Sequence, residues 1–207
     1  MASSEDIANI EPGSAALLMM DMQPAVLAGG FDGTDTLIER LAGVRAVARA
    51  RGVQSIFVRV GFRSGYPEIS PRNKTFSQIA AAGRLGLQDP AASICPDLAP
   101  EPDDIVVTKH RVSGFHATDL DQILRSKGID TIILSGVATS GVVLSTLRAG
   151  ADLDYRCFVV SDGCIDRDEL VHDVLVNKVF PRQAHVLSSA ALIQALQATA
   201  PKEGAHA

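Results

Sequence analysis

The stretch IDTIILSGVATSGVVLSTLRAGADLDY, residues 129–155, predicts a buried strand, a glycine-marked turn and a helix in direct succession. The TIIL run is β-branched and aliphatic, and it ends just before Gly136. Val143, Leu147 and Ala151 then recur at the spacing of one helix face. A strand that leads directly into a helix places the first N–H groups of the helix at the carboxyl end of a sheet, where they can hold an anion. We therefore expect the functional site at this turn.

Apolar runs and helical patterns alternate along the rest of the chain. The strands are expected at residues 15–20, 54–60, 105–108, 131–134, 156–161 and 185–187. The helices are expected from Thr36 to near Gly52, at 75–82, from Thr118 to near Gly128, from Val143 onward, around Leu170, Val171, Val174 and Leu175, and at a last segment that ends near Leu196. Six strands alternating with helices predict an α/β fold: a mostly parallel sheet covered on both faces, in three α/β/α layers.

A chain of 207 residues is expected to form one domain. We expect this domain at residues 15–198, with a loose N-terminal arm at 1–14 and a flexible C-terminal tail at 199–207. Residues 61–104 are punctuated by glycine and proline. So long an irregular segment in a compact domain is usually functional or mobile.

Composition excludes several classes of function. Although 46% of the residues are hydrophobic, no apolar run approaches eighteen residues, so no membrane span is expected. The N-terminus has no charged-then-apolar signal region, and we expect a cytoplasmic protein. A net charge of −5 without a basic stripe argues against nucleic acid as a partner. Cys95, Cys157 and Cys164 lack metal-type spacing and are expected to be reduced thiols.

Two charged residues directly follow predicted strands. Asp21 follows the first strand and Lys109 follows the third. The carboxyl ends of parallel strands meet at one edge of the sheet, where ligands bind such folds, so we expect both side chains beside the 136–142 turn. A buried carboxyl group beside a lysine can serve as a general acid or base with a shifted pKa. The alternative interpretation is a structural ion pair.

Three segments together carry a resemblance to a known family. GVATSGV at 136–142, LLMMDMQ around Asp21 and VVTKHRVSGFHATDL around Lys109 resemble the signatures of the isochorismatase-like hydrolases, often called cysteine hydrolases. The resemblance implies a Rossmann-like sheet with strand order 3-2-1-4-5-6 and a non-proline cis peptide between Val137 and Ala138. It also implies a homodimer or higher homo-oligomer, with residues 61–103 as the expected contact.

The same resemblance assigns roles to the site residues. In the family an aspartate takes the proton of a nucleophilic cysteine and a lysine supports the charge, and these positions match Asp21 and Lys109. The cysteine position is Val142, whose side chain can neither attack a carbonyl nor ionise. Members that lack the cysteine cleave a vinyl ether instead, because the aspartate protonates the alkene carbon and water then adds. The expected substrate contacts are Gln23, Arg63, Phe115, Ala138, Thr139, Ser140 and Gly141.

Two classes of function therefore stay open. The first is a hydrolase that acts on a small carboxylated metabolite through Asp21 and Lys109, by vinyl-ether or other C–O or C–N hydrolysis without a covalent thiol intermediate. The second is a catalytically silent family member that binds a small ligand. Residues 59–72 lack the Asp and His pattern with which nicotinamidase-like members hold a metal, so neither a metal nor another cofactor is expected.

Overall fold

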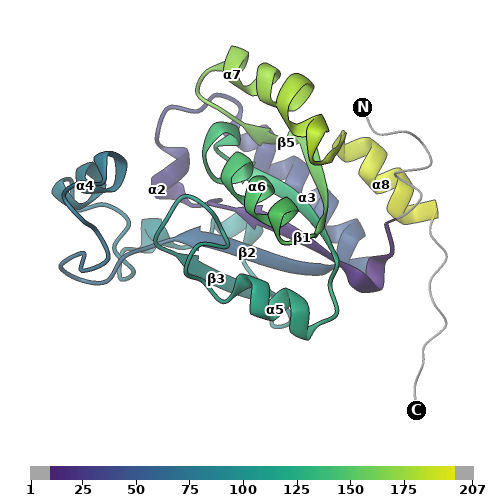
Figure 1. The fold of residues 1–207 in the computed structure, drawn as a ribbon, viewed down its shortest axis with the longest axis horizontal. Coiled ribbons are helices and arrows are strands. Elements are labelled where there is room, and N and C mark those ends of the chain that lie inside the picture. Colours follow the sequence, from purple (N-terminus) through teal and green to yellow (C-terminus); the bar gives the residue numbers. More distant parts are fainter. Residues whose placement is uncertain (1–9, 199–207) are drawn as a thin grey trace.

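The computed structural model describes residues 10–198 and contains a six-stranded sheet with the order β3-β2-β1-β4-β5-β6 (Figure 1). Every pair of neighbouring strands is parallel. The strands are β1 (Ala15–Met20), β2 (Gln54–Val60), β3 (Ile105–Lys109), β4 (Thr131–Val137), β5 (Arg156–Ile165) and β6 (His185–Leu187). The expected α/β class and the strand order that the resemblance implied are both confirmed.

Helices connect the strands and form the two outer layers. The α-helices are α2 (Pro24–Leu27), α3 (Thr34–Ala50), α4 (Lys74–Ala81), α5 (Leu120–Ser126), α6 (Leu144–Asp152), α7 (Glu169–Val174) and α8 (Ser189–Ala198). Short 3-10 turns lie at Pro12–Ser14, Pro90–Ala92, Pro96–Leu98 and Phe180–Arg182, and π-helical turns at Thr139–Val143 and Leu175–Val179.

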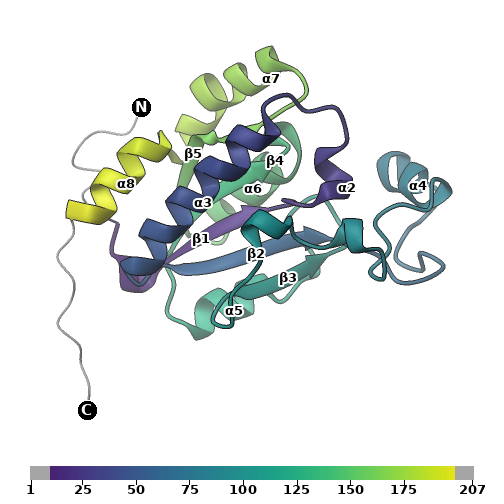
Figure 2. The same ribbon diagram turned by 180° about the vertical axis from the view of Figure 1, so that it is seen from behind.

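The alternation of side chains along β1 divides the core in two. Leu18 and Met20 belong to the cluster that includes α5 and α6, whereas Leu17 and Met19 belong to the cluster that includes α3 and α8. Figures 1 and 2 show α6 and α3 on opposite faces of the sheet. All six residues of β1 are buried, as expected for a central strand covered on both faces.

Several boundaries differ from the sequence-based expectation. The helix expected from Thr36 begins at Thr34, after Gly33 at φ 75°. The helix expected from Thr118 begins at Leu120, and the Thr118 hydroxyl just before it donates to the Gly114 carbonyl at 2.6 Å and accepts the Leu120 N–H at 3.4 Å. Residues 10–14 of the expected loose arm are partly packed, and Ile10 is buried in the core. Residues 1–9 and the expected tail 199–207 lie outside the described residues.

Residues 61–104 leave the sheet and return to it. They carry α4, which lies away from the three layers in both views (Figures 1 and 2), and a small apolar cluster that includes Phe62, Phe76 and Leu85. No helix within residues 10–198 is long and apolar enough to cross a membrane.

Candidate active site

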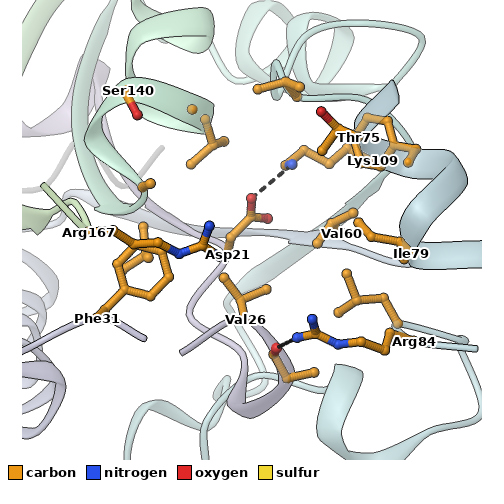
Figure 3. Close-up of a pocket in the computed structure, with 18 of the residues that line it drawn as sticks. Asp21, Val26, Phe31, Val60, Thr75, Ile79, Arg84, Lys109, Ser140 and Arg167 are labelled. Carbon is orange, nitrogen blue, oxygen red and sulfur yellow. Dashed lines mark hydrogen bonds and ion pairs between the residues drawn. The ribbon is translucent and has the colours of Figure 1, made fainter. Parts of the chain in front are cut away.

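Asp21 and Lys109 meet at the carboxyl edge of the sheet. Asp21 leaves β1 with a positive φ of 55°, and its N–H donates to the Val58 carbonyl at 2.7 Å. Lys109 is the last residue of β3, and its Nζ lies 2.9 Å from Asp21 Oδ2. Nζ also donates to the Arg111 carbonyl at 3.0 Å. The ion pair expected from the strand ends is confirmed (Figure 3).

The pair is deeply buried, and the burial changes its chemistry. The side chain of Lys109 is 2% exposed and that of Asp21 is 10% exposed. Burial raises the pKa of the Asp21 carboxyl, although the Lys109 ammonium opposes this rise. The second oxygen, Oδ1, has no hydrogen-bond partner among the described residues. Burial therefore makes the protonated form of Asp21 more accessible than that of an exposed aspartate, and Oδ1 is not engaged by another described group.

The turn after β4 forms the adjacent wall. Gly136 has φ 126°, and a Cβ at this position would lie 2.0 Å from the Met20 carbonyl oxygen, so the close approach to β1 requires glycine. The cis peptide expected between Val137 and Ala138 is present. The following π-helical turn, Thr139–Val143, leads directly into α6.

Val142 lies within this turn and faces the same pocket as Asp21 and Lys109. Its side chain is 2% exposed and packs into the core cluster under α6. The neighbouring hydroxyl groups that line the pocket are those of Ser140 and Ser145. The backbone N–H of Ser140 donates to Asp166 Oδ2 at 2.7 Å, so an internal carboxylate already occupies this donor.

The pocket has a volume of about 720 Å³, which is within the range of small-molecule sites. Its floor is formed by the strand ends and the 137–142 turn, and α4 supplies Thr75, Phe76, Gln78 and Ile79 to another wall. Of the expected substrate contacts, Ala138, Ser140 and Gly141 line it.

The other four expected contacts lie outside the pocket lining. Gln23 is fully buried, and its amide bonds both backbone groups of Val60, at 2.8 Å each, and so ties α2 to β2. The Arg63 guanidinium, which is 67% exposed, pairs with Glu68 at 2.7 Å. Each side chain thus already has a structural partner.

Phe115 and Thr139 are also held by neighbouring side chains. The Phe115 ring stacks on Tyr155 with 5.7 Å between centroids. Thr139 is buried, and its hydroxyl lies 2.8 Å from Nδ1 of His172 in α7. Two arginines that line the pocket, Arg84 and Arg167, were not anticipated, because they lie in irregular segments without a periodic pattern.

Among residues 10–198, no cluster of three His, Cys, Asp or Glu side chains is placed to hold a metal ion. The three cysteines are buried and unpaired by disulfides, and burial raises the pKa of the Cys157 and Cys164 thiols to about 12. None of the three lines the pocket.

The fold and the site define a parallel α/β protein with a small-molecule pocket at the carboxyl edge of its sheet. Residues 15–191 match the family described as the Isochorismatase domain. The uncharacterised isochorismatase family protein YecD of Escherichia coli O157:H7 is 32% identical over 186 residues, which cover 88% of this chain and 96% of YecD. This chain therefore belongs to the isochorismatase family.

Further relatives agree with this assignment. The ureidoacrylate amidohydrolase RutB of Pseudomonas syringae pv. syringae (strain B728a) is 34% identical over 179 residues, which cover 74% of this chain and 71% of RutB. The crystal structure of a cysteine hydrolase from Pseudomonas syringae pv. phaseolicola 1448A superposes with a TM-score of 0.85 at 26% identity, and the match covers 91% of this chain and 94% of that one.

Proposed function

We propose that this protein is a hydrolase that acts on a small carboxylated molecule through Asp21 and Lys109, without a covalent thiol intermediate. The observation that carries the proposal is the buried Asp21 carboxyl group. Its pKa is raised by burial, its Oδ1 has no partner among the described residues, and it lines a pocket whose wall is closed by the inert side chain of Val142. The enzyme name of the RutB relative supports a hydrolytic reaction.

The arrangement suits acid catalysis at a vinylic carbon. In the reacting form, in which Asp21 is protonated, Asp21 gives its proton to the alkene carbon, and the adjacent C–O or C–N carbon becomes an oxocarbenium or iminium ion. Water adds to that cation, the adduct collapses to an aldehyde and releases the alcohol or amine portion, and the proton of the water returns to Asp21. Lys109 stabilises the carboxylate while the proton is away. No step requires a nucleophile at Val142.

The relatives suggest a first substrate to test. Ureidoacrylate, which the name of the RutB relative gives as its substrate, carries a vinylic C–N bond and a carboxylate in one small molecule. It therefore contains both features that the proposed reaction needs. A vinyl-ether carboxylate of similar size provides the matching C–O substrate.

One observation favours the second candidate, a silent ligand-binding member. The Asp166 carboxylate accepts the Ser140 N–H at 2.7 Å, so this donor in the turn is held by the chain itself. A protein that had lost its chemistry could keep the pocket and bind a ligand without converting it.

The test is turnover of ureidoacrylate and of a vinyl-ether carboxylate by the wild type and by Asp21→Asn. We expect the variant to lose at least about 100-fold in kcat, because positioned proton transfer contributes about that much or more. Asp152→Asn makes the same chemical change at an exposed position in α6, outside the pocket, and is expected to stay within about twofold. A wild type that binds both compounds but converts neither would favour the silent member.

A further inference from the structure

Arg167 is held in a fixed position at the rim of the pocket. It lies two residues beyond β5, and its Nε donates to the Gly29 carbonyl at 2.7 Å. The guanidinium carbon lies 5.0 Å from the centroid of the Phe31 ring. Figure 3 shows the guanidinium beside this ring and directed toward the side of the pocket where Asp21 lies. A hydrogen bond and a ring contact therefore orient an exposed arginine that would otherwise be free to rotate.

The backbone beside Arg167 is shaped to receive it. A Cβ at Gly29 would lie 2.8 Å from Arg167 Nη2, which is closer than real Cβ contacts allow. The guanidinium thus lies against bare backbone. Because Nε and one face of the guanidinium are used in this contact, the two Nη groups remain as donors, in the fork geometry that matches a carboxylate.

The residues that line the pocket carry more positive than negative charge, which favours an anionic ligand. While Asp21 is ionised, its carboxylate offsets the charge of the Lys109 ammonium, whose Nζ lies 2.9 Å from Oδ2. Both oxygens of Asp166 accept backbone N–H groups, from Ser140 at 2.7 Å and from Arg167 at 2.9 Å. Within the described part of the chain, neither Arg167 nor Arg84 forms an ion pair with a carboxylate.

The second arginine is held less tightly. An Nη2 group of Arg84 donates to the Ala25 carbonyl, and no aromatic ring from residues 10–198 lies against its guanidinium. The pocket lining therefore carries three cations and two carboxylates, which suits a ligand with a single negative charge.

We propose that Arg167 binds the carboxylate of the substrate through its two Nη groups and makes the pocket selective for small monocarboxylates. The inference rests on the proposed function, which places the reaction at Asp21. A substrate whose carboxylate is bound by Arg167 can extend its reacting group toward Asp21. Carboxylate binding itself requires no catalysis and can be measured separately.

The test is ligand-dependent thermal unfolding of the full-length protein with acrylate and 3-ureidopropionate. Each compound is compared with its primary amide at matched ionic strength. The wild type is expected to be stabilised by the carboxylates and not by the amides. Arg167→Gln is expected to raise the apparent Kd for both carboxylates at least tenfold. Arg167→Lys keeps the charge but not the two Nη donors, and its Kd is expected to lie between those of the wild type and Arg167→Gln.

Arg84→Gln is the matched comparison, because it removes the same charge from the same pocket and is expected to change the Kd less than threefold. Equal increases in Kd for Arg84→Gln and Arg167→Gln would overturn the proposal. They would indicate that the carboxylate responds to the total positive charge of the pocket and not to contacts with Arg167. Stabilisation of the wild type by neither carboxylate would overturn it as well. Carboxylate binding that depends on Arg167 in a protein without turnover would leave this inference standing and refute the hydrolase.

Discussion

Lys109→Met tests whether the buried ion pair is the electrostatic centre of the site. Methionine has a similar length and stays apolar, so the substitution leaves the Asp21 carboxylate buried without its cation. With side chains only 2% and 10% exposed, we expect a loss of about 3–5 kcal/mol in the free energy of unfolding at neutral pH. With a urea dependence of about 2 kcal/mol per molar, the unfolding midpoint falls by about 2 M.

The pH dependence of this loss has a defined sign. Burial raises the folded-state pKa of Asp21 above its ordinary value of 3.8, and removal of the Lys109 ammonium raises it further, because the ammonium opposes the shift. Between the unfolded and the folded pKa, the folded state binds more protons, so its stability falls as pH rises through that window. The variant should therefore lose less relative to wild type at about pH 5 than at about pH 8.

Urea unfolding followed by circular dichroism at both pH values measures the effect. Lys127→Met is the control, because Lys127 is exposed at the end of α5 and should change stability by less than about 0.5 kcal/mol. Asp21→Asn combined with Lys109→Met should recover part of the loss, since no buried charge remains. A loss of less than about 1 kcal/mol, or one that does not change with pH, would refute the interpretation of the pair as buried and coupled.

Three further predictions concern the thiol position, the native thiols and the assembly. Val142→Cys should place a thiolate beside the ammonium, acylate with activated esters and gain turnover on simple amides; a new thiol that resists small electrophiles would contradict this. Iodoacetamide should leave wild-type turnover intact, because Cys157 and Cys164 have pKa values raised to about 12, and inactivation that tracks labelling of Cys164 would refute it. Sedimentation should show a dimer or higher oligomer at micromolar concentration, and substitutions within 61–103 should dissociate it.

The sequence pattern predicted the bounds of three of the six strands. The expected ranges of β1, β2 and β6 coincide with the observed strands. The pattern ended β4 at residue 134 and β5 at 161, whereas they extend to Val137 and Ile165. Each extension begins with small or polar residues and ends in an aliphatic one, Val137 or Ile165, and the two extensions pair with each other beyond a register shift between Leu134 and Gly136. Neighbouring strands impose such pairing, so it cannot be deduced from one segment.

Helix α7 shows the same limit in another form. Leu170, Val171 and Val174 recur at helical spacing, and they predict an apolar helix in this region. In the structure these three side chains are exposed at 70%, 37% and 46%. The buried positions begin at Leu175, where the chain passes into a π-helical turn. The apolar spacing identified the helix. Which of its residues pack on the sheet depends on where α7 ends and the π-helical turn at Leu175 begins.

Some residues of the candidate site could be predicted from the sequence and others could not. Asp21 and Lys109 could be brought together from sequence, because each directly follows a strand and parallel strands end at one edge. Arg167 could not, since its position depends on a carbonyl at Gly29 and a ring at Phe31, more than 130 residues earlier in the chain. The position of Asp21, and so the chemistry assigned to it, is set by the end of strand β1. The selectivity assigned to Arg167 comes from two irregular segments in contact, where substitutions can change the ligand without disturbing the sheet.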